Sequence, residues 1–461
     1  MDLLLINPGK VRHDYVSEHL GIASLKAYTQ QQGFEVDTID MAIERLSVAD
    51  GIDKILEMNP QVVGFSLLDD SRFKGLGVIK GIRRAGYRGA IIVGGYFASF
   101  AAEELLRDFR EIDFVVRGEG ELTLAELLEK IIHQSPLAFH EIRGISFREK
   151  NQIVHNTARP LIADLDVLPP VDRKYARVVL ERGFHLRMAA SRGCWGQCTF
   201  CDIIGMYRQS PGKIWRSRSI KNVVDEIEQL SQRFQTEHFA FNDDQFLLPG
   251  KKGEERAEAL AAELEKRNLK IQFELMSRAD TVSFVTMKRL KSVGLQRVFL
   301  GLESFNPRQL QRFQKRISIR QNLKALITLY QLEIDVIASV ILADAFTSLR
   351  DVIDQFFILV QLRRRYFNSQ KCQISINKKI EIFRGSLIYQ QYKQQGLLSR
   401  DHYMDGYDYH LKLGTYLRLK LFDLEASLSR FIRKPLISLR NLWRAIRWWT
   451  GQLARYLEYG R

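Results

Sequence analysis

Short apolar runs alternate with helical segments over residues 1–135 of the 461-residue chain. Strands that are separated by helices of this length form βαβ units, which build a parallel, doubly wound sheet. Residues 1–135 are therefore predicted to form an α/β domain of this class. The predicted strands are Leu3–Ile6, Val36–Ile39, Val62–Leu68, Ala90–Val93 and Phe114–Val116, and the predicted helices are residues 20–32, 48–58, 74–85, 99–109 and 121–133.

Glycines follow the last two of these strands, at Gly94–Gly95 and within Gly118–Glu121. In open parallel sheets, ligands bind beyond the carboxyl ends of the strands, where glycine lets the backbone approach a ligand closely. Tight turns between strand and helix use glycine for the same conformational reason. The residues alone leave both interpretations open.

Residues 136–180 differ in character and are predicted to be a connector. Gly144–Arg148 and Ile153–Asn156 indicate a small hairpin, and Leu165–Pro170 ends in two prolines that interrupt regular structure.

A second alternation of strands and helices runs through residues 181–395 and predicts a partial or complete parallel barrel. Barrel enzymes carry their chemistry at the carboxyl ends of the strands. The predicted strands are Leu186–Ala190, His238–Phe241, Gln272–Met276, Arg297–Leu300, Val336–Leu342 and Gln373–Ile376, and the predicted helices are residues 219–234, 253–267, 282–293, 307–314, 319–332 and 348–364.

Three of the four cysteines, Cys194, Cys198 and Cys201, follow the first barrel strand directly. Thiolates are ligands for zinc or for iron–sulfur clusters, but a structural zinc site needs four ligands, and no fourth Cys or His lies nearby. Three thiolates can hold three irons of a cubane cluster and leave the fourth iron open for a cosubstrate. The fourth cysteine, Cys372, is far along the chain and is predicted to be a small buried hydrophobe.

The loop resembles the CxxxCx(aromatic)C motif of the radical S-adenosylmethionine (SAM) superfamily, with Phe200 at the aromatic position. The resemblance implies a 4Fe–4S cluster on the three cysteines and SAM on the open iron. It also implies that reductive cleavage releases a 5′-deoxyadenosyl radical, with flavodoxin or ferredoxin as the electron donor. A zinc knuckle and ordinary core cysteines are the alternatives.

Other strand ends resemble further landmarks of this superfamily, such as the turn Gly301–Ser304. The Asp344 turn departs from the commoner glycine-rich turn that contains proline. The resemblance does not identify the catalytic residues, which stay unknown. The alternative for the landmark residues is that they are strand-end groups facing solvent. The residues that it implies for SAM binding are Phe200, Asp243, Ser277, Arg278, Glu303 and Ser304.

The domain order resembles the cobalamin-binding subgroup of radical SAM enzymes over residues 1–395. Cobalamin mutases and methionine synthase carry a D-x-H-x-x-G motif whose His ligates cobalt, and neither His13 nor His19 matches it. Cobalamin would then bind without a protein histidine ligand, or the domain would bind none. The residues that the resemblance implies around cobalamin are Ser66, Gly94, Gly95, Gly118 and Glu119.

Three functions follow from these resemblances. The leading one is cobalamin-dependent methylation of an unactivated carbon in a small-molecule or peptide substrate. The second keeps the radical barrel but performs cyclisation, dehydration or another rearrangement without methyl transfer. The third is a non-catalytic cobalamin or metal sensor. A transfer-RNA methylthiotransferase is disfavoured, because that class carries additional cysteines in its first domain and residues 1–193 contain none.

The net charge of +15 is concentrated near the C-terminus. Residues 411–461 hold eleven basic and three acidic side chains, and Arg430–Arg447 resembles an amphipathic surface helix. Residues 396–461 are therefore predicted to be a basic helical region that docks on the barrel, a membrane surface or a partner. No motif indicates nucleic acid. The cysteine pattern does not suggest disulfides, and we see neither a secretory leader nor an apolar run of membrane length, so a cytoplasmic protein is expected, with peripheral membrane contact as an option.

Overall fold

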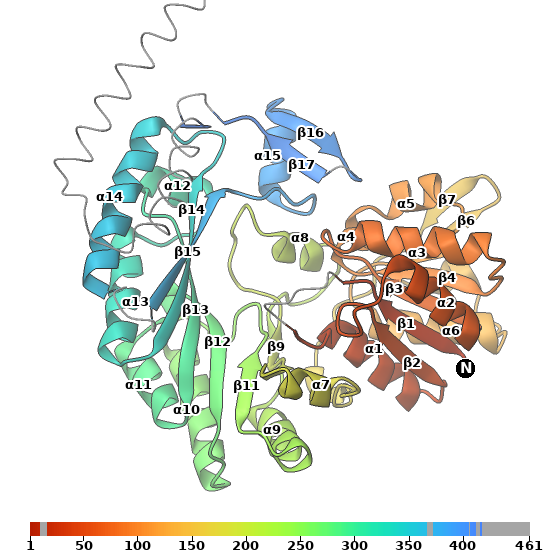
Figure 1. Cartoon of the computed structure of the whole chain (residues 1–461), viewed down its shortest axis with the longest axis horizontal. Helices are drawn as coiled ribbons and strands as arrows, with labels where there is room; N and C mark the ends of the chain where they lie inside the picture. Colours follow the sequence, from red (N-terminus) through yellow and green to blue (C-terminus); the bar gives the residue numbers. More distant parts are fainter. Residues whose placement is uncertain (10–15, 367–371, 405, 412–414, 417–461) are drawn as a thin grey trace, which may run out of the picture. The chain divides into compact units, whose positions relative to one another are not determined.

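A seven-stranded sheet organises the N-terminal part of the computed structural model, in the order β2-β1-β3-β4-β5-β6-β7 (Figure 1). The first five strands are parallel, and the chain order reverses beside β1, which places a topological switch point between β1 and β3. The elements are β1 (Leu3–Asn7), α1 (Leu20–Gln31), β2 (Val36–Asp40), α2 (Val48–Met58), β3 (Val62–Ser66), α3 (Arg72–Arg84), β4 (Ala90–Gly94), α4 (Tyr96–Phe100), α5 (Ala102–Asp108), β5 (Phe114–Val116) and α6 (Glu121–Ile132).

Alternate residues of the strands build a separate apolar core on each face of this sheet. Leu4 and Ile6 belong to one core, which also contains side chains of α2, α3 and α5. Leu3 and Leu5 belong to the other core, with side chains of α1 and α6. Helices therefore cover both faces, as the sequence predicted for a doubly wound domain. The helix predicted at residues 99–109 is interrupted at Ala101, between α4 and α5.

The hairpin predicted within the connector belongs to the N-terminal sheet. Strand β6 (Ile145–Glu149) pairs antiparallel with β5, and β7 (Gln152–His155) extends the edge. Ile145 and Phe147 are buried in the same core as Ile92 and Leu124. The sheet therefore continues past residue 135 into the segment that we predicted to be a connector.

A second sheet of six parallel strands follows, in the order β15-β14-β13-β12-β11-β8 (Figure 1). Strands β8 and β15 are its two edges, so the described sheet is an open, partial barrel. All six predicted strands are present. The elements are β8 (Leu186–Met188), α9 (Ile220–Phe234), β11 (His238–Phe241), α10 (Lys251–Lys266), β12 (Gln272–Arg278), α11 (Phe284–Ser292), β13 (Leu295–Glu303), α12 (Pro307–Arg312), α13 (Ile319–Gln331), β14 (Asp335–Ala343), α14 (Leu349–Tyr366) and β15 (Cys372–Lys379).

The prediction of helices from residue 396 is wrong for the first part of that region. After α15 (Leu387–Gln394), strands β16 (Leu398–His402) and β17 (Gly406–Tyr409) form an antiparallel hairpin. The ring of Tyr409 contacts that of Tyr392, with 5.1 Å between centroids. This contact with a distant residue stabilises a strand where local composition suggested a helix.

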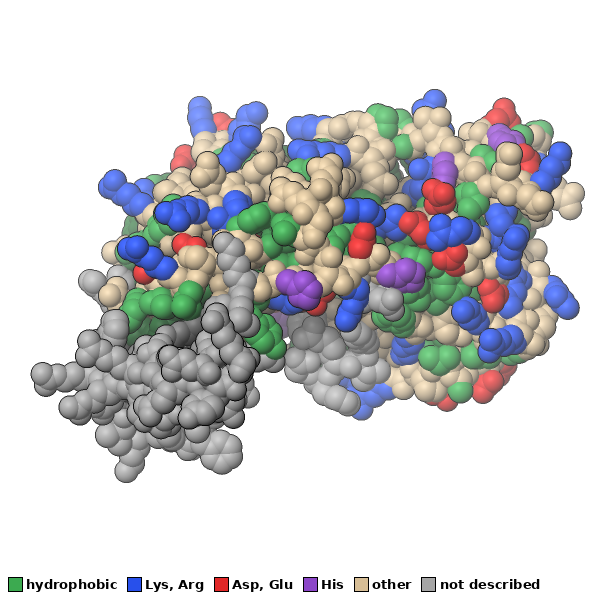
Figure 2. Space-filling view, turned by 90° about the horizontal axis from the view of Figure 1, so that it is seen from above, with side chains coloured by type: hydrophobic (Ala, Val, Ile, Leu, Met, Phe, Trp, Pro, Cys, Tyr) green, Lys and Arg blue, Asp and Glu red, His purple; other side chains and the backbone are tan. Residues whose placement is uncertain are grey.

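The structure describes residues 1–9, 16–366, 372–404, 406–411 and 415–416. Residues 1–410 form one compact unit. The amphipathic segment Arg430–Arg447 lies outside the described residues. Within the described ranges, no helix is both long and apolar enough to cross a membrane. On the face shown in Figure 2, the described Lys and Arg side chains are interspersed with acidic and apolar ones and do not form one continuous basic patch.

Candidate functional site

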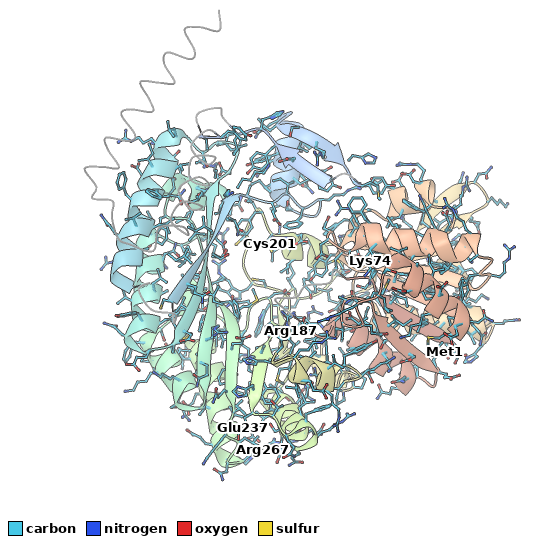
Figure 3. All side chains as sticks on the ribbon, viewed as in Figure 1. Met1, Lys74, Arg187, Cys201, Glu237 and Arg267 are labelled. Carbon is cyan, nitrogen blue, oxygen red and sulfur yellow. The ribbon has the colours of Figure 1, made fainter. Side chains whose placement is uncertain are left out.

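The three clustered cysteines lie on the connection between β8 and α9. Cys201 is the N-cap of the short helix α8 (Asp202–Arg208), and Figure 3 labels it beside that helix. Its backbone N–H donates to the carbonyl of Cys198 at 3.3 Å. Gly193, with φ of +77°, passes so close to Ile214 that an added Cβ would lie 2.2 Å from its carbonyl oxygen. A side chain at position 193 would therefore displace the backbone that presents Cys194.

The donor set of this loop fits a cluster with one open iron. The thiols of Cys194, Cys198 and Cys201 are free and partly exposed. Burial raises the pKa of Cys194 and of Cys201, so thiolates here need a cationic partner such as iron. Three cysteines on one loop can hold three irons of a cubane cluster and leave the fourth iron open. The described residues contain no group of three or more His, Cys, Asp or Glu side chains arranged around a single metal ion.

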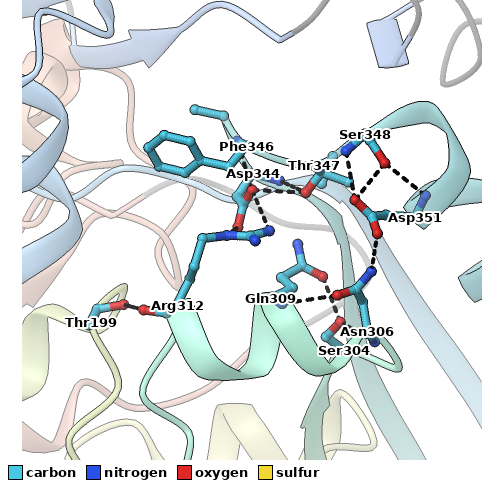
Figure 4. Close-up of polar contacts among 12 residues, drawn as sticks. Thr199, Ser304, Asn306, Gln309, Arg312, Asp344, Phe346, Thr347, Ser348 and Asp351 are labelled. Atoms are coloured by element: carbon cyan, nitrogen blue, oxygen red, sulfur yellow. Dashed lines mark hydrogen bonds and ion pairs between the residues drawn. The ribbon is translucent and has the colours of Figure 1, made fainter.

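The polar network in Figure 4 anchors the cysteine loop on α12. The hydroxyl of Thr199 donates to the backbone carbonyl of Arg312 at 3.0 Å. The backbone N–H of Thr199 donates to the carbonyl of Phe313, also at 3.0 Å. Arg312 in turn makes a bidentate ion pair with the buried carboxylate of Asp344, at 2.7 and 3.0 Å. The Asp344 turn, which departs from the superfamily pattern, thus stabilises the cysteine loop indirectly, through Arg312.

Four of the six residues predicted to bind SAM make contacts with other side chains or backbone groups of the protein. Asp243 is buried, accepts hydrogen bonds from Ser191 and from the backbone of Ala190, and has its pKa raised to about 6 by burial. Ser304 is buried, and its hydroxyl lies within hydrogen-bond distance of the side-chain amides of Gln309 and Gln355. The hydroxyl of Ser277 is hydrogen-bonded to that of Thr281 at 2.7 Å. The ring of Phe200 packs edge-on against that of Phe313, with 5.1 Å between centroids.

Arg278 and Glu303 are the other two residues predicted to bind SAM. Arg278 lies close to the cysteine loop. Glu303 pairs with Lys315, whose pKa is raised by Glu303 and Cys198 against the effect of burial. Arg278 Nη1 is 3.3 Å from the sulfur of Cys198. Glu303 has a positive φ of 63° at the end of β13, and its Oε1 is 2.8 Å from Nζ of Lys315. Lys315 is buried and was missed by the sequence analysis, because a lysine in a polar loop carries no sign of burial.

A cavity of about 540 Å³ opens beyond the carboxyl ends of β3, β4 and β5. Its lining includes all five residues predicted to surround cobalamin, namely Ser66, Gly94, Gly95, Gly118 and Glu119. On the barrel side it reaches Arg192, Tyr207 and Asp244, which flank the cysteine loop. The structure therefore brings together two groups of residues that lie far apart in the sequence.

Glu119 is held by the protein itself. Its carboxylate pairs with Arg216 at 2.9 Å and with Arg192 at 3.2 Å, and it also accepts from the backbone N–H of Ile162 at 2.8 Å. Arg192 continues to the buried Glu121 at 2.6 Å. Burial opposes ionisation of Glu121, but Arg192 holds the pKa of that carboxyl below its usual range. Glu119 and Glu121 thus tie the glycine turn after β5 to the start of the cysteine loop.

Two family models match the chain, a B12 binding domain over residues 11–128 and the Radical SAM superfamily over residues 188–351. The chain is a radical SAM protein with an N-terminal B12-binding domain. These matches confirm the resemblance and the fold class inferred from the sequence. They support a 4Fe–4S cluster, SAM and cobalamin as the cofactors.

Two curated proteins of similar sequence are a methyltransferase and a cyclase. An uncharacterized methyltransferase of Pyrococcus horikoshii is 29% identical over 316 residues, which are 67% of this chain and 66% of the relative. An anaerobic magnesium-protoporphyrin IX monomethyl ester cyclase of Synechocystis is 28% identical over 285 residues, 60% of this chain and 54% of the relative. The chain thus spans less than two thirds of the length of these relatives.

The fold also matches a solved structure. The structure of the cobalamin-dependent SAM radical enzyme OxsB, with aqua-cobalamin and SAM bound, superposes with a TM-score of 0.76 at 20% identity and covers 93% of this chain and 67% of that one. At this identity the match establishes the fold.

His19 lines the cavity of the B12-binding domain, immediately before α1. Its Nδ1 accepts the backbone N–H of Ile22 at 3.2 Å, and its Nε2 faces the hydroxyl of Ser66 at 3.2 Å. Burial lowers the pKa of His19, so the ring is neutral at neutral pH. Since Nδ1 is an acceptor, the one ring proton is on Nε2, which leaves no lone pair directed into the cavity.

Proposed function

We propose that this chain is a cobalamin-dependent radical SAM enzyme that methylates an unactivated carbon of a small-molecule or peptide substrate. The observation that carries the proposal is the cavity, because its lining runs from the strand ends of the B12-binding domain to the residues that flank the cysteine loop. A methyl donor held there would lie beside the site of radical formation. The methyltransferase among the relatives supports the same reaction class.

The protein's contribution is to hold the cofactors and to keep water from them. When bound, the cluster with SAM supplies a carbon-centred radical, and cobalamin supplies a transferable methyl group. Leu5, Ile92 and Val116 give the cavity an apolar wall. The phenols of Tyr96 and Tyr207 are protonated at neutral pH, as tyrosines ordinarily are, and burial raises the pKa of each further. They add polar groups without charge to the cavity lining.

The deciding experiment is anaerobic reconstitution followed by optical spectra, hydroxocobalamin binding and product analysis. We expect cluster absorbance, cobalamin binding at micromolar concentration, deoxyadenosine in the presence of dithionite and a methylated product. Absence of cobalamin binding would refute methyl transfer. Absence of deoxyadenosine from cluster-loaded protein would instead favour the non-catalytic sensor.

Gly94→Leu is expected to weaken cobalamin binding by tenfold or more. Gly94 lines the cavity, and a Cβ there meets Val116 only at ordinary contact distances of 3.4 and 3.8 Å, so the backbone tolerates the change while the side chain competes with the corrin for space. Equilibrium dialysis of hydroxocobalamin measures the effect. Iron content serves as the control and should match the wild type. Unchanged cobalamin affinity would place the corrin elsewhere.

Cobalamin bound here is expected to lack a histidine ligand, because the ring nitrogens of His19 are both engaged. The electron paramagnetic resonance (EPR) spectrum of bound cob(II)alamin should be the same whether the protein carries natural-abundance or ¹⁵N-labelled histidine. Nitrogen splitting from the cofactor's own base would be unaffected by this label. A splitting that changes with the histidine label would contradict the expectation.

A second candidate function is a radical rearrangement or cyclisation without methyl transfer, which the cyclase among the relatives favours. Product mass distinguishes the two functions.

We also propose flavodoxin or ferredoxin as the electron donor, to be tested by replacing dithionite with each protein. Contact of the basic C-terminal segment with membranes stays a prediction, testable by sedimentation with anionic vesicles at low and high salt.

A further inference from the structure

The guanidinium of Arg278 is fixed against the cysteine loop. It stands at the end of β12, its side chain is 7% exposed, and it lies over the ring of Trp195 at 4.6 Å from the centroid. Trp195 immediately follows Cys194 in the sequence. From this position Nη1 donates a hydrogen bond to the sulfur of Cys198 at 3.3 Å.

Three of the four other N–H donors of Arg278 are occupied by oxygen acceptors of the protein. Nε and Nη2 bind the two carboxylate oxygens of Asp280, each at 3.0 Å, and Nη2 also donates to the carbonyl of Lys315 at 2.6 Å. A guanidinium grips a carboxylate through two parallel N–H groups. In Arg278 the two possible pairs are Nε with Nη2 and Nη1 with Nη2. Each of these three nitrogens already contacts Asp280, Lys315 or the sulfur of Cys198. This geometry suits a fixed donor to sulfur better than a clamp for the carboxylate of SAM.

The surroundings make this hydrogen bond persistent. Asp280 balances the charge of Arg278, and Glu303 balances that of the buried Lys315, so the cations are held without a counter-ion from the cofactor. Hydrogen bonds to cluster sulfurs and nearby charge are among the factors that set the reduction potential of an iron–sulfur cluster. A donor at the sulfur withdraws electron density from the ligand and stabilises the reduced cluster.

We propose that Arg278 is a positioning residue that raises the reduction potential of the cluster through its hydrogen bond to Cys198, and that it does not hold the carboxylate of SAM, although the resemblance implied that it binds SAM. The proposal rests on the cluster part of the proposed function and does not depend on cobalamin or methyl transfer. The step it affects is the transfer of one electron from an external donor to the oxidised cluster.

The test compares Arg278→Met with a matched control, Arg297→Met. Arg297 is on the neighbouring strand β13, pairs with Glu274 at 3.4 Å and Asp335 at 3.5 Å, and makes no described contact with the cysteine loop. Each variant is reconstituted anaerobically, its iron and sulfide are counted, and its midpoint potential is measured without SAM by EPR-monitored redox titration. A SAM dissociation constant is measured in parallel.

We expect Arg278→Met to hold four irons with a more negative midpoint potential and a SAM dissociation constant within about threefold of the wild type. Arg297→Met should leave the potential unchanged. Arg278→Lys, which keeps a cationic donor, should recover part of the shift, and it decides the question if the Met variant does not assemble its cluster. An unchanged potential in Arg278→Lys and Arg278→Met, or a tenfold loss of SAM affinity without a shift, overturns the proposal.

The outcomes separate this proposal from the proposed function. A wild-type chain that loads its cluster but binds no cobalamin refutes methyl transfer and leaves the potential shift measurable. A wild-type chain that assembles no cluster overturns both proposals.

Discussion

Cys198→Ala is expected to abolish both cluster assembly and deoxyadenosine formation. The open iron of the proposed cluster requires the other three irons to be held by the three thiolates of one loop, and the fourth cysteine of the sequence, Cys372, is not part of that loop. Cys198 is also the sulfur that receives the hydrogen bond of Arg278. Its loss removes a ligand and leaves that buried donor without an acceptor.

Iron and sulfide per chain, the visible spectrum and deoxyadenosine formed with dithionite measure the effect of Cys198→Ala. The matched control is Cys372→Ala, because Cys372 is buried at the start of β15 and is not part of the loop. That variant should keep wild-type iron and deoxyadenosine, with a stability loss of about 1 kcal/mol. Wild-type deoxyadenosine formation by Cys198→Ala would refute the cluster assignment.

Arg173→Met is expected to lower the free energy of unfolding by about 3–5 kcal/mol, because it breaks a buried ionic triad. The Arg173 side chain is 2% exposed and pairs with Glu18 at 2.8 Å and Glu226 at 2.9 Å, whose side chains are 3% and 6% exposed. Arg218 also lies against Glu226, so the carboxylate left alone by the substitution is that of Glu18. Denaturant unfolding of the cofactor-free chain measures the loss.

A double variant and a pH series test the cause of this loss. Arg173→Met with Glu18→Gln should recover much of the stability, since the uncompensated charge is removed. Burial raises the pKa of Glu18 even beside Arg173, and the single variant should raise it further. A carboxyl whose folded-state pKa is raised contributes stability at low pH that is lost as the pH rises through that pKa. The single variant should therefore be closer to the wild type at pH 5 than at pH 8, and equal losses at both would argue against Glu18 as the source.

Local patterns in the sequence predicted the elements of this protein well. The strands of both sheets appear where apolar runs stop at glycines and acids, because burial of a strand between helices requires such a run. The cysteine spacing likewise predicted the metal-binding loop, since ligands for one cluster must be close in space and here are close in sequence.

Pairings between distant segments could not be predicted in this way. The Ile145–His155 hairpin joins the N-terminal sheet because Ile145 and Phe147 complete its core, and the Leu398–Tyr409 hairpin forms where helices were expected. Local periodicity does not specify which strand edge is unpaired or which core lacks a side chain. Those properties arise only when the whole chain is folded.

The features of the site likewise fall into those that the sequence predicted and those that only the tertiary structure revealed. The sequence by itself determined the cysteines, the strand-end glycines and the order of the two domains, because short-range spacing encodes them. The tertiary structure alone decided that Glu119 pairs with Arg216 and Arg192, that Lys315 neutralises Glu303 and that Arg278 contacts Cys198. The partner of a buried charge is chosen by which side chains the fold brings within a few ångströms, and spacing along the chain does not record that choice.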